Sequence, residues 1–526
     1  MNTLLLLFMI LFSLSSILGQ GFENDTRKRL SWSVANMDEL LKLEEELALN
    51  LEHYTNELIK KYNTISWGIS MMDVRHVFQS EMGPKKFWEN PLNSYSLIRH
   101  MESDWHMWQL YMEKPVGLEQ LAFLESKKPT MPQYHDFYDA AEGLRRTQWT
   151  YDLLAQDISQ GLLDGVQYNS SLTALDCFDL VQHLINGSRW SIAMQWIEAT
   201  KLALDRSDPQ PAIQMLRGIT PALLYKTLAK AQVEQGEVDK ALKAYQLALI
   251  YSPKDAELRQ EFFDLELKSL IMPGNHSVKP EQKDDGEDIK LPFCCSGQCD
   301  LPSKLQLYCW WNTQSHPFLR LAPIKTEFLS LDPHVVLLHD VVSAAERTRF
   351  QTTSKKDLLP SGTVDIETDT LLNEQDRTSM SLWYDEHPND TKRLNVLLQD
   401  ATGLDMEYSE SYQVMNYGIG GLFETHMDSL LKNEDRYRGI PDRLATVLFY
   451  LSEVPQGGAT VFPELNLTVF PQPGSALFWY NTDKKGYQNT QTLHAGCPVI
   501  VGSKWVMSKW IDDLGQELRA PCKVSD

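Results

Sequence analysis

The sequence predicts a multidomain protein that is all-α over its N-terminal half and all-β over its C-terminal part. Three observations support this fold class: apolar side chains at helical spacing near the start, a helical repeat pattern in the middle, and short β-branched or aromatic runs towards the end. The chain has 526 residues, of which 43% are hydrophobic and 23% are charged. It is therefore long enough for three or more domains that each bury a core.

Residues 1–19 have the composition of a signal peptide. The segment 4–18 is mostly apolar and ends before the small residue Gly19, where we place the cleavage site. No Lys or Arg precedes this run, so a single membrane anchor is the alternative, although a spanning helix needs about 20 apolar residues. We expect a soluble mature protein that passes through the secretory pathway.

Six Asn-x-Ser/Thr sequons fit passage through that pathway and predict a glycoprotein. They lie at Asn24, Asn169, Asn186, Asn275, Asn389 and Asn466. The formal net charge of -22 argues against nucleic acid and anionic membranes as partners, because both are themselves negative. Basic or neutral polypeptides remain open as partners.

Seven cysteines fall into groups along the chain. The groups are Cys294, Cys295, Cys299 and Cys309, then Cys497 and Cys522, with Cys177 alone. In an oxidising compartment this grouping predicts local disulfides. A zinc site built from the first group is the alternative.

Residues 20–150 are predicted to form an N-terminal helical domain. Apolar residues recur in steps of three and four from Met37 to about Ile65, with Glu44 as the one lapse, and more helix is expected from Leu97 to Met112. The apolar stripe consists of Met37, Leu40, Leu47, Leu51, Tyr54 and Leu58. This stripe fits either an ordinary bundle helix or self-association through a short coiled coil.

Residues 165–265 fit a tetratricopeptide-like (TPR-like) domain. With Pro253 as the closing proline of a repeat of about 34 residues, the packing positions hold small and aromatic residues: Tyr225, Leu228, Ala229, Gly236, Ala241, Tyr245 and Ala248. A weaker copy precedes it at Cys177, Leu180, Ala193 and Ile197. Because one repeat cannot bury its own face, the two should stack into a solenoid whose concave side holds an extended peptide. A plain helical hairpin is the alternative.

Residues 273–290 are polar and rich in Lys, Asp and Glu, which predicts a linker before a final domain of residues 291–526. Beyond Asp332, β-branched and aromatic runs are broken by Gly and Pro, and we expect no helices between them. The predicted strands are 411–416, 445–451, 460–462, 467–470, 475–480, 499–501 and 504–511. This pattern predicts an antiparallel sandwich or barrel.

His426 and Asp428 are the strongest candidates for a metal site. Positions two apart on a strand project from the same face, so both side chains can bind one ion. His494 offers a third ligand, and Lys504 follows it. Two histidines and one carboxylate leave open positions on non-haem Fe(II), and Lys504 can pair with the far carboxylate of 2-oxoglutarate. These residues therefore point to an oxygenase.

Residues 408–522 resemble the catalytic domain of the alpha subunits of collagen-type prolyl 4-hydroxylases. The likeness is carried by NYGIGG before HMD, by RLATVLFYLSEVPQGGATVFPE, by GSALFWYN and by HAGCPVIVGSKWVMSKWI. It implies a double-stranded β-helix of jelly-roll type, with its core in residues 408–512. The implied activity is a dioxygenase reaction that converts peptidyl proline to 4-hydroxyproline with O2 and 2-oxoglutarate and releases succinate and CO2.

The resemblance also implies residue roles. His426, Asp428 and His494 match the iron ligands, and Lys504 matches the anchor of 2-oxoglutarate. Tyr417 and Tyr450 match tyrosines that reach towards this cosubstrate, although a tyrosine on a strand is as often simply packed. Two intrachain disulfides are implied, Cys497 with Cys522 and Cys295 with Cys309. Ascorbate is implied as the reductant that rescues oxidised iron.

The order of parts matches the family over nearly the whole mature chain. It implies an N-terminal dimerising segment, a central domain that binds the substrate peptide, and a protein disulfide isomerase partner in an alpha2beta2 tetramer. Residues 523–526 are not a retrieval signal of the Lys-Asp-Glu-Leu type. Residence in the endoplasmic reticulum lumen would therefore depend on that partner.

The TPR-like domain departs from the family pattern. Collagen-type members line the concave helix with tyrosines, whereas the inward positions here are Lys226, Lys230, Val233 and Glu234. We expect this groove to prefer a proline-containing polypeptide with acidic residues over a long collagen strand. Two alternatives remain: an oxygenase that acts on lysine or on a non-collagen protein, and a catalytically silent TPR paralogue that only binds peptides.

Overall fold

The computed structural model describes residues 29–206, 213, 216–271, 290–299, 308–362, 364–365, 370–371, 376–384, 388–430 and 441–519. The predicted signal peptide, Cys522 and all but the last residue of the predicted linker lie outside this part of the chain. Contacts divide the chain into two compact units, residues 36–133 and the remainder. The predicted domain boundaries stay predictions. Within the described ranges, every helix is too short or too polar to traverse a bilayer.

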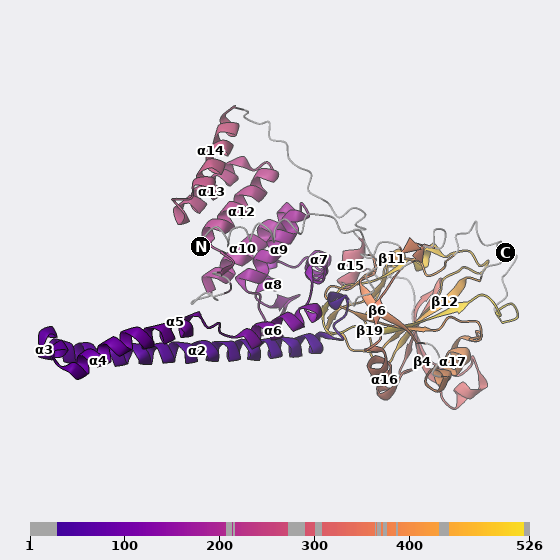
Figure 1. Ribbon diagram of the computed structural model, residues 1–526. Helices are drawn as coiled ribbons and strands as arrows, with labels where there is room; N and C mark the ends of the chain where they lie inside the picture. The colour runs from indigo at the N-terminus through magenta and orange to yellow at the C-terminus, as the bar shows by residue number, and fades with distance from the viewer. Residues whose placement is uncertain are drawn as a thin grey trace. The chain divides into compact units, whose positions relative to one another are not determined.

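Residues 36–133 form a helical unit. Its longest element, α2 (Met37–Met82), contains the predicted helix and continues beyond Ile65. Shorter elements follow it: α3 (Pro84–Glu89), α4 (Pro91–Arg99), a π-helical turn (His100–Asp104), α5 (Trp105–Glu113), α6 (Leu118–Lys127) and a 3-10 turn (Lys128–Thr130). Figure 1 shows α5 and α6 alongside α2, and Lys61 donates hydrogen bonds from α2 to the carbonyls of Met112 and Lys114. Leu51 of the predicted stripe is 64% exposed in the single chain, and self-association stays a prediction.

The other unit begins with residues 29–35 and then, from Tyr134, with helices that stack in pairs (Figure 1). The elements are α7 (Tyr134–Thr150), α8 (Ala155–Ser159), the hairpin β1 (Leu162–Leu163) and β2 (Val166–Gln167), α9 (Ala174–Asn186), α10 (Trp190–Arg206), α12 (Pro221–Glu234), α13 (Val238–Tyr251) and α14 (Ala256–Ile271). The pairs α9–α10 and α12–α13 cover the residues of the two predicted repeats, and their assignment to a TPR-like domain stays a prediction.

Local sequence explains where these helices begin. The Thr173 side chain accepts a hydrogen bond from the backbone N–H of Asp176, and the Asp176 carboxylate accepts one from the backbone N–H of Thr173. This reciprocal capping box satisfies N–H groups that lack a partner within the helix. At α12 the Thr220 side chain accepts a hydrogen bond from the backbone N–H of Leu223, and Pro221 occupies the first turn, where no N–H is needed.

Small side chains allow α12 and α13 to pack closely. Ala229, Ala241 and Ala248 are fully buried between these helices, and Tyr245 is nearly so. Gly236 in the connecting turn has a φ of 78°, a left-handed conformation that favours glycine. The residues that predicted the repeat therefore pack its core.

The C-terminal domain contains two antiparallel sheets, which confirms the predicted jelly-roll class. The large sheet has the order β3-β4-β5-β16-β12-β19-β10-β9-β6, and the smaller sheet has the order β11-β17-β14-β15. The large sheet comprises β3 (Cys309–Asn312), β4 (Ile324–Leu331), β5 (His334–His339), β6 (Leu359–Pro360), β9 (Ser379–Tyr384), β10 (Tyr412–Tyr417), β12 (Arg443–Tyr450), β16 (Ala476–Tyr480) and β19 (Trp505–Asp512). The smaller sheet comprises β11 (Phe423–His426), β14 (Thr460–Phe462), β15 (Leu467–Val469) and β17 (His494–Gly496). Two strand pairs flank them, β7 (Val364–Asp365) with β8 (Thr370–Leu371) and β13 (Gln456–Gly457) with β18 (Val499–Val501).

Alternation along the strands gives the large sheet two apolar faces. On β16, Leu477 and Trp479 join a core that includes Phe462 and Leu467 of the smaller sheet. Their neighbour Phe478 points to the opposite face and joins a second core. The large sheet is therefore the middle layer, and the functional residues described below lie on the side of the smaller sheet.

Helices cover the second face, and the expectation that no helix interrupts the strands beyond Asp332 is wrong. α16 (Ala344–Ser354) and α17 (Pro388–Thr402) lie between strands in the sequence. Ser343 and Glu346 form a capping box at the start of α16. Leu394 and Leu398, one helical turn apart on α17, are fully buried in the core on this face. These short helices have few apolar residues, so their periodicity is weak in the sequence.

The disulfides differ from the predicted pairs. Cys295 is bonded to Cys497, and Cys294 is bonded to Cys299. Cys295 ends α15 (Lys290–Cys295), which packs against β14, and this places its Cα 5.6 Å from that of Cys497, just after β17. Cys309 lies on the edge strand β3 as an exposed free thiol. Both predicted pairings, Cys497 with Cys522 and Cys295 with Cys309, are therefore corrected.

Candidate metal and cosubstrate site

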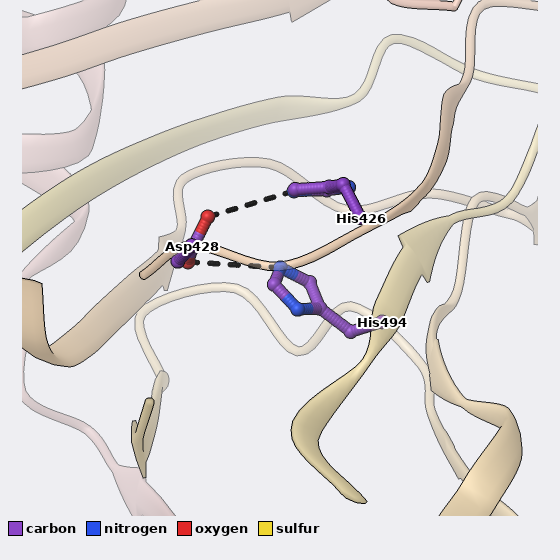
Figure 2. A group of neighbouring side chains, drawn as sticks. All are labelled: His426, Asp428 and His494. Atoms are coloured by element: carbon purple, nitrogen blue, oxygen red, sulfur yellow. Dashed lines mark ion pairs between the residues drawn. The ribbon is translucent and has the colours of Figure 1, made fainter. Parts of the chain in front are cut away.

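The three predicted metal ligands meet at one end of the smaller sheet. His426 is the last residue of β11, and His494 is the first residue of β17. These two residues are direct partners in the antiparallel register, so their side chains share a face. Asp428 follows β11 by two residues, and β11 therefore ends earlier than the sequence argument assumed. The chain nevertheless turns the Asp428 carboxylate towards both imidazoles (Figure 2).

The geometry of this group suits a single ion. His426 Nε2 lies 3.5 Å from Asp428 Oδ1, and His494 Nε2 lies 3.6 Å from Asp428 Oδ2 (Figure 2). One nitrogen or oxygen from each side chain falls within 4.8 Å of the others. Ligand atoms that surround an ion at a little over 2 Å have separations of this size. Among the described residues, no other trio of His, Cys, Asp or Glu has this arrangement.

Backbone and side-chain groups orient all three ligands. Nδ1 of His426 lies 2.7 Å from the carbonyl of Glu424, and Nδ1 of His494 lies 3.0 Å from that of Thr492. A carbonyl can only accept, so each Nδ1 carries the proton and each Nε2 keeps its lone pair for a metal.

The carboxylate of Asp428 is held from behind by neutral groups. Thr446 on β12 donates its hydroxyl proton to Asp428 Oδ2 at 2.7 Å, and Asn481 donates to the Thr446 hydroxyl at 2.9 Å. This short chain of hydrogen bonds fixes the plane of the carboxylate without neutralising it.

Protonation states also fit a metal site. Burial alone would favour the neutral acid, but the positive charge that His494 and His426 carry when protonated and the guanidinium of Arg443 oppose it and hold the pKa of Asp428 well below its usual range. Burial, assisted by His426, lowers the pKa of His494 to about 4. Near pH 7, Asp428 is therefore ionised and His494 is neutral, as metal ligands must be.

Lys504 lies in the same pocket and has no acidic partner among the residues that the structure describes. Its side chain is 2% exposed, and no hydrogen bond or ion pair to its ammonium group occurs within the described residues. Burial lowers the pKa of Lys504 to about 7. An unpaired buried cation is costly, so this site fits a ligand that brings its own carboxylate.

The two predicted tyrosines have different positions. Tyr417 on β10 lines the pocket, and its ring centroid lies 4.9 Å from Lys504 Nζ. Tyr450 on β12 lies behind Thr460, to which its hydroxyl donates a hydrogen bond at 2.9 Å. Thr460 lines the pocket and Tyr450 does not. A direct contact of Tyr450 with a cosubstrate would therefore require that Thr460 move.

Sequence reasoning missed several pocket residues. Arg377, Trp479 and Trp510 line the same cavity and are at most 6% exposed. Their side-chain atoms Arg377 Nε, Trp479 Nε1 and Trp510 Nε1 are buried without a hydrogen-bond partner in the described part of the chain. A pocket with unsatisfied donors favours a ligand rich in acceptors, such as a dicarboxylate. Strand alternation was the available signal, since Trp510 lies two positions from Ser508 and six from Lys504.

The predicted groove residues on α12 are engaged within the chain. Lys226 Nζ lies 3.5 Å from Glu257 Oε1 and 3.3 Å from Glu261 Oε1, and Lys230 Nζ lies 3.2 Å from the same Glu261 oxygen. Val233 packs partly buried against the α12–α14 core, and Glu234 is also partly buried. The two lysines therefore meet carboxylates of α14 in the free protein.

The residues present fit Fe(II) and 2-oxoglutarate together. Two neutral imidazoles and one carboxylate are the ligand set of non-haem Fe(II) oxygenases, and it leaves open positions for a chelating keto acid. Lys504, unpaired in the same cavity, suits the far carboxylate of that acid.

Comparison with known proteins gives two matches to family descriptions. Residues 33–165 match the "Prolyl 4-Hydroxylase alpha-subunit, N-terminal region", and residues 412–512 match the "2OG-Fe(II) oxygenase superfamily". The second match contains His426, Asp428, His494 and Lys504.

Relatives align with almost the whole chain. Prolyl 4-hydroxylase subunit alpha-1 of Rattus norvegicus is 31% identical over 517 residues, which cover 94% of this chain and 95% of that protein. The Homo sapiens protein of the same name is 31% identical over 520 residues with the same coverage. A solved structure of the viral collagen prolyl hydroxylase from Paramecium Bursaria Chlorella virus-1, in complex with 2OG, is 24% identical and covers 34% of this chain and 95% of its own, with a TM-score of 0.29.

Proposed function

We propose, from the premise that this chain belongs to the prolyl 4-hydroxylase alpha-subunit family, that it converts peptidyl proline to 4-hydroxyproline. It is an Fe(II)- and 2-oxoglutarate-dependent dioxygenase. The observation that carries the proposal is one cavity that holds both the group His426, Asp428 and His494 and the unpaired Lys504. A protein that only bound peptides would have no need for an unpaired buried cation beside three metal-ligand side chains.

Each residue of the cavity has a separate task. His426, Asp428 and His494 hold the metal, and Lys504 with Tyr417 positions the cosubstrate at a fixed distance from it. The buried walls formed by Trp479 and Trp510 exclude water. When bound, iron and 2-oxoglutarate supply the oxidation: 2-oxoglutarate and O2 yield succinate and CO2, and one oxygen atom enters a C–H bond of proline.

The substrate is a proline-containing polypeptide. We infer a non-collagen or mixed-sequence polypeptide as an equal candidate to procollagen, because α12 presents lysines and a valine where collagen-type members carry tyrosines. Lys226 and Lys230 are paired within the chain, so an acidic peptide would have to displace Glu261. A catalytically silent peptide-binding paralogue is disfavoured because all four key side chains are present.

Partner, reductant and location are proposed on the family relationship and on the sequence. They are a protein disulfide isomerase subunit in an alpha2beta2 tetramer, ascorbate as the reductant that rescues oxidised iron, and the endoplasmic reticulum lumen. Glycosylation is proposed at the sequons Asn169, Asn186 and Asn466, whose side chains are exposed. Removal of residues 1–19 as a signal peptide belongs to the same proposal.

Succinate production tests this function directly. The chain is co-expressed with a disulfide isomerase, loaded with Fe(II), and incubated with 2-oxoglutarate, ascorbate and a panel of proline peptides. We expect peptide-dependent succinate and a mass gain of one oxygen on the peptide. The His426→Ala variant should give neither. Equal succinate from both proteins, or none from an assembled and iron-loaded sample, would reject the proposal.

A further inference from the structure

Residues 30–35, which we call the strap, pack against the C-terminal domain, although they lie near the start of the described chain. Trp32 is 4% exposed and belongs to the main core of the C-terminal domain. The N–H of Leu30 donates to Asp136 Oδ1 of α7 at 2.9 Å, and the N–H of Ile419 donates to the carbonyl of Ser31 at 3.0 Å. The strap is therefore held between α7 and the loop that follows β10.

The approach between the strap and this loop is close enough to require glycine. A Cβ added at Gly418 would lie 1.9 Å from the Ser31 carbonyl oxygen and 2.5 Å from the Trp32 carbonyl carbon. Backbone atoms cannot yield as a flexible side chain could. The strap and the chain just after Tyr417 are thus fitted to each other at the level of the backbone.

Asn416 connects the strap to the cavity. Its side chain is completely buried, and its Oδ1 accepts hydrogen bonds from the Ser33 hydroxyl at 2.6 Å and from the Ala35 N–H at 3.2 Å. Its Nδ2 donates to the Ser503 hydroxyl at 3.0 Å and to the Lys504 carbonyl at 3.2 Å. One side of the amide is therefore satisfied by the strap, and the other side holds the backbone of Lys504.

The same backbone positions the groups that meet the cosubstrate. The Lys504 carbonyl also accepts from the N–H of Tyr417 at 3.1 Å, and Asn416 pairs with Trp505 in the β10–β19 register. Rotation of the Asn416 amide would release Ser503 and Lys504 on one side and leave a buried oxygen unsatisfied on the other. Ser33 and Ala35 are its only partners on the oxygen side among the described residues.

From this arrangement we propose that Ser33 and Asn416 are positioning residues for 2-oxoglutarate, and that the strap completes the cosubstrate site from outside the sheets. The proposal rests on the proposed function. The strap leads directly into α2 at Met37, so the chain segment that holds Asn416 is also the entry to the other compact unit. A C-terminal domain produced without residues 29–35 would accordingly lack the hydrogen-bond donors that the strap supplies to the Asn416 side-chain oxygen.

Two serine variants in the full chain give a matched test. Ser31 and Ser33 are both buried in the strap, at 4% and 3% exposure, but the Ser31 hydroxyl has no hydrogen-bond partner within the described residues. Ser33→Ala removes the contact with Asn416, whereas Ser31→Ala removes the same atom without that contact. Affinity for 2-oxoglutarate is measured by calorimetry with Mn(II) in place of iron and without O2.

Ser33→Ala also removes the hydrogen bond that the Ser33 hydroxyl accepts from the Ala35 N–H at 3.1 Å. We expect the variant to raise the Kd for 2-oxoglutarate by about three- to tenfold, the range of the buried hydrogen bond to Asn416. Ser31→Ala should stay within about twofold of the unsubstituted protein, and Ser33→Thr, which keeps the hydroxyl, should restore most of the affinity. The Kd for Mn(II) should not change in any variant, because the metal ligands lie on other strands. Adding Ser33→Ala to Asn416→Ala should cause little further loss, since the two residues act as one unit.

The outcomes separate the inference from the function on which it rests. If the unsubstituted chain neither binds nor consumes 2-oxoglutarate, the proposed function fails. If it does both and Ser33→Ala binds 2-oxoglutarate like Ser31→Ala, the role of the strap is overturned. An equal loss of Mn(II) and 2-oxoglutarate binding in Ser33→Ala would also overturn it, because that pattern indicates general loosening of the fold.

Discussion

Lysines have opposite surroundings in two regions of this protein, the oxygenase cavity and the groove on α12 that we predict to bind a peptide. In the oxygenase cavity, Lys504 is 2% exposed and has no carboxylate partner in the described residues. In the predicted groove on α12, the Lys226 and Lys230 side chains are 18% and 52% exposed, and both contact Glu261. An unpaired charge is most costly in a buried cavity, and the cavity is where the unpaired lysine lies.

This difference separates a charge kept for a ligand from a charge used within the fold. An isolated ammonium in a dry cavity destabilises the free protein, and a carboxylate ligand relieves that cost on binding. A partly exposed pair costs little to form and contributes little when formed. Unpaired charge in the cavity is therefore the stronger indicator of a binding site, and the groove lysines alone do not identify a substrate.

Removal of the Lys504 charge should have the largest effect. In Lys504→Met the KM for 2-oxoglutarate should rise at least about tenfold and up to about 100-fold, because a buried hydrogen bond to a charged group contributes about 1.5–3 kcal/mol. The rate at saturating 2-oxoglutarate should fall much less. Succinate formation across a range of 2-oxoglutarate concentrations measures both.

Lys509 provides the matched control for this substitution. It lies on β19, five residues after Lys504 in the chain, is also buried, and donates a hydrogen bond to the carbonyl of Glu410. Lys509→Met should lower stability and leave the KM for 2-oxoglutarate within about twofold. A similar rise in KM in both variants would mean that the loss of any buried lysine weakens binding of 2-oxoglutarate. The missing partner of Lys504 would then not explain the effect.

The pH dependence of binding gives a second, intermediate effect. Burial lowers the pKa of Lys504 to about 7 in the free protein, and a bound carboxylate should raise it again. Below pH 7 the amine is already charged, and above pH 7 binding must take up a proton. The Kd for 2-oxoglutarate should therefore rise by up to about tenfold per pH unit above 7.

Calorimetry at pH 8 in two buffers of different ionisation enthalpy measures this proton uptake. We expect close to one proton per 2-oxoglutarate bound by the unsubstituted chain and none by Lys504→Met. No uptake in the unsubstituted chain would show that Lys504 stays charged without a partner, and would remove the contrast with the groove.

Much of the cavity could be predicted because its key residues have short-range signatures. His426 and Asp428 are two positions apart, and His494 and Lys504 lie within one short stretch of sequence, HAGCPVIVGSKWVMSKWI. The strands were also predictable, since β-branched and aromatic runs give β12, β14, β16 and β19 within one or two residues. Asp428 lies just past the end of β11, which spacing alone could not show.

Other features depend on pairings across long stretches of sequence. Cys295 and Cys497 are 202 residues apart, and Ser33 and Asn416 are 383 apart. Neither spacing carries a local signal, because each contact exists only after α15 or the strap has packed on the C-terminal domain. The partners of Lys226 and Lys230 lie on the next helix but one, so the sequence showed two free lysines where the fold has ion pairs.

The smallest expected effect comes from breaking those ion pairs. The Glu261 carboxylate forms ion pairs with Lys226 at 3.3 Å and with Lys230 at 3.2 Å. It also accepts a hydrogen bond from the Tyr245 hydroxyl at 3.3 Å. In Glu261→Gln the lysines lose this charge partner, and an acidic proline-containing peptide should bind the full chain about two- to fivefold more tightly, with less than about 1 kcal/mol change in the free energy of unfolding. Fluorescence anisotropy of the labelled peptide measures the affinity.

Glu198→Gln is the control for that substitution, because it removes a similar surface partner, from Lys201 on α10, at 3.7 Å. It should leave peptide affinity unchanged, and the gain in Glu261→Gln should disappear at high salt, since exposed charges are screened. A collagen-like (Pro-Pro-Gly) repeat should gain nothing from either variant. If that repeat binds the unsubstituted chain more tightly than the acidic peptide does, the groove recognises its ligand by proline stacking and not by charge. The paired lysines would then only stabilise the fold.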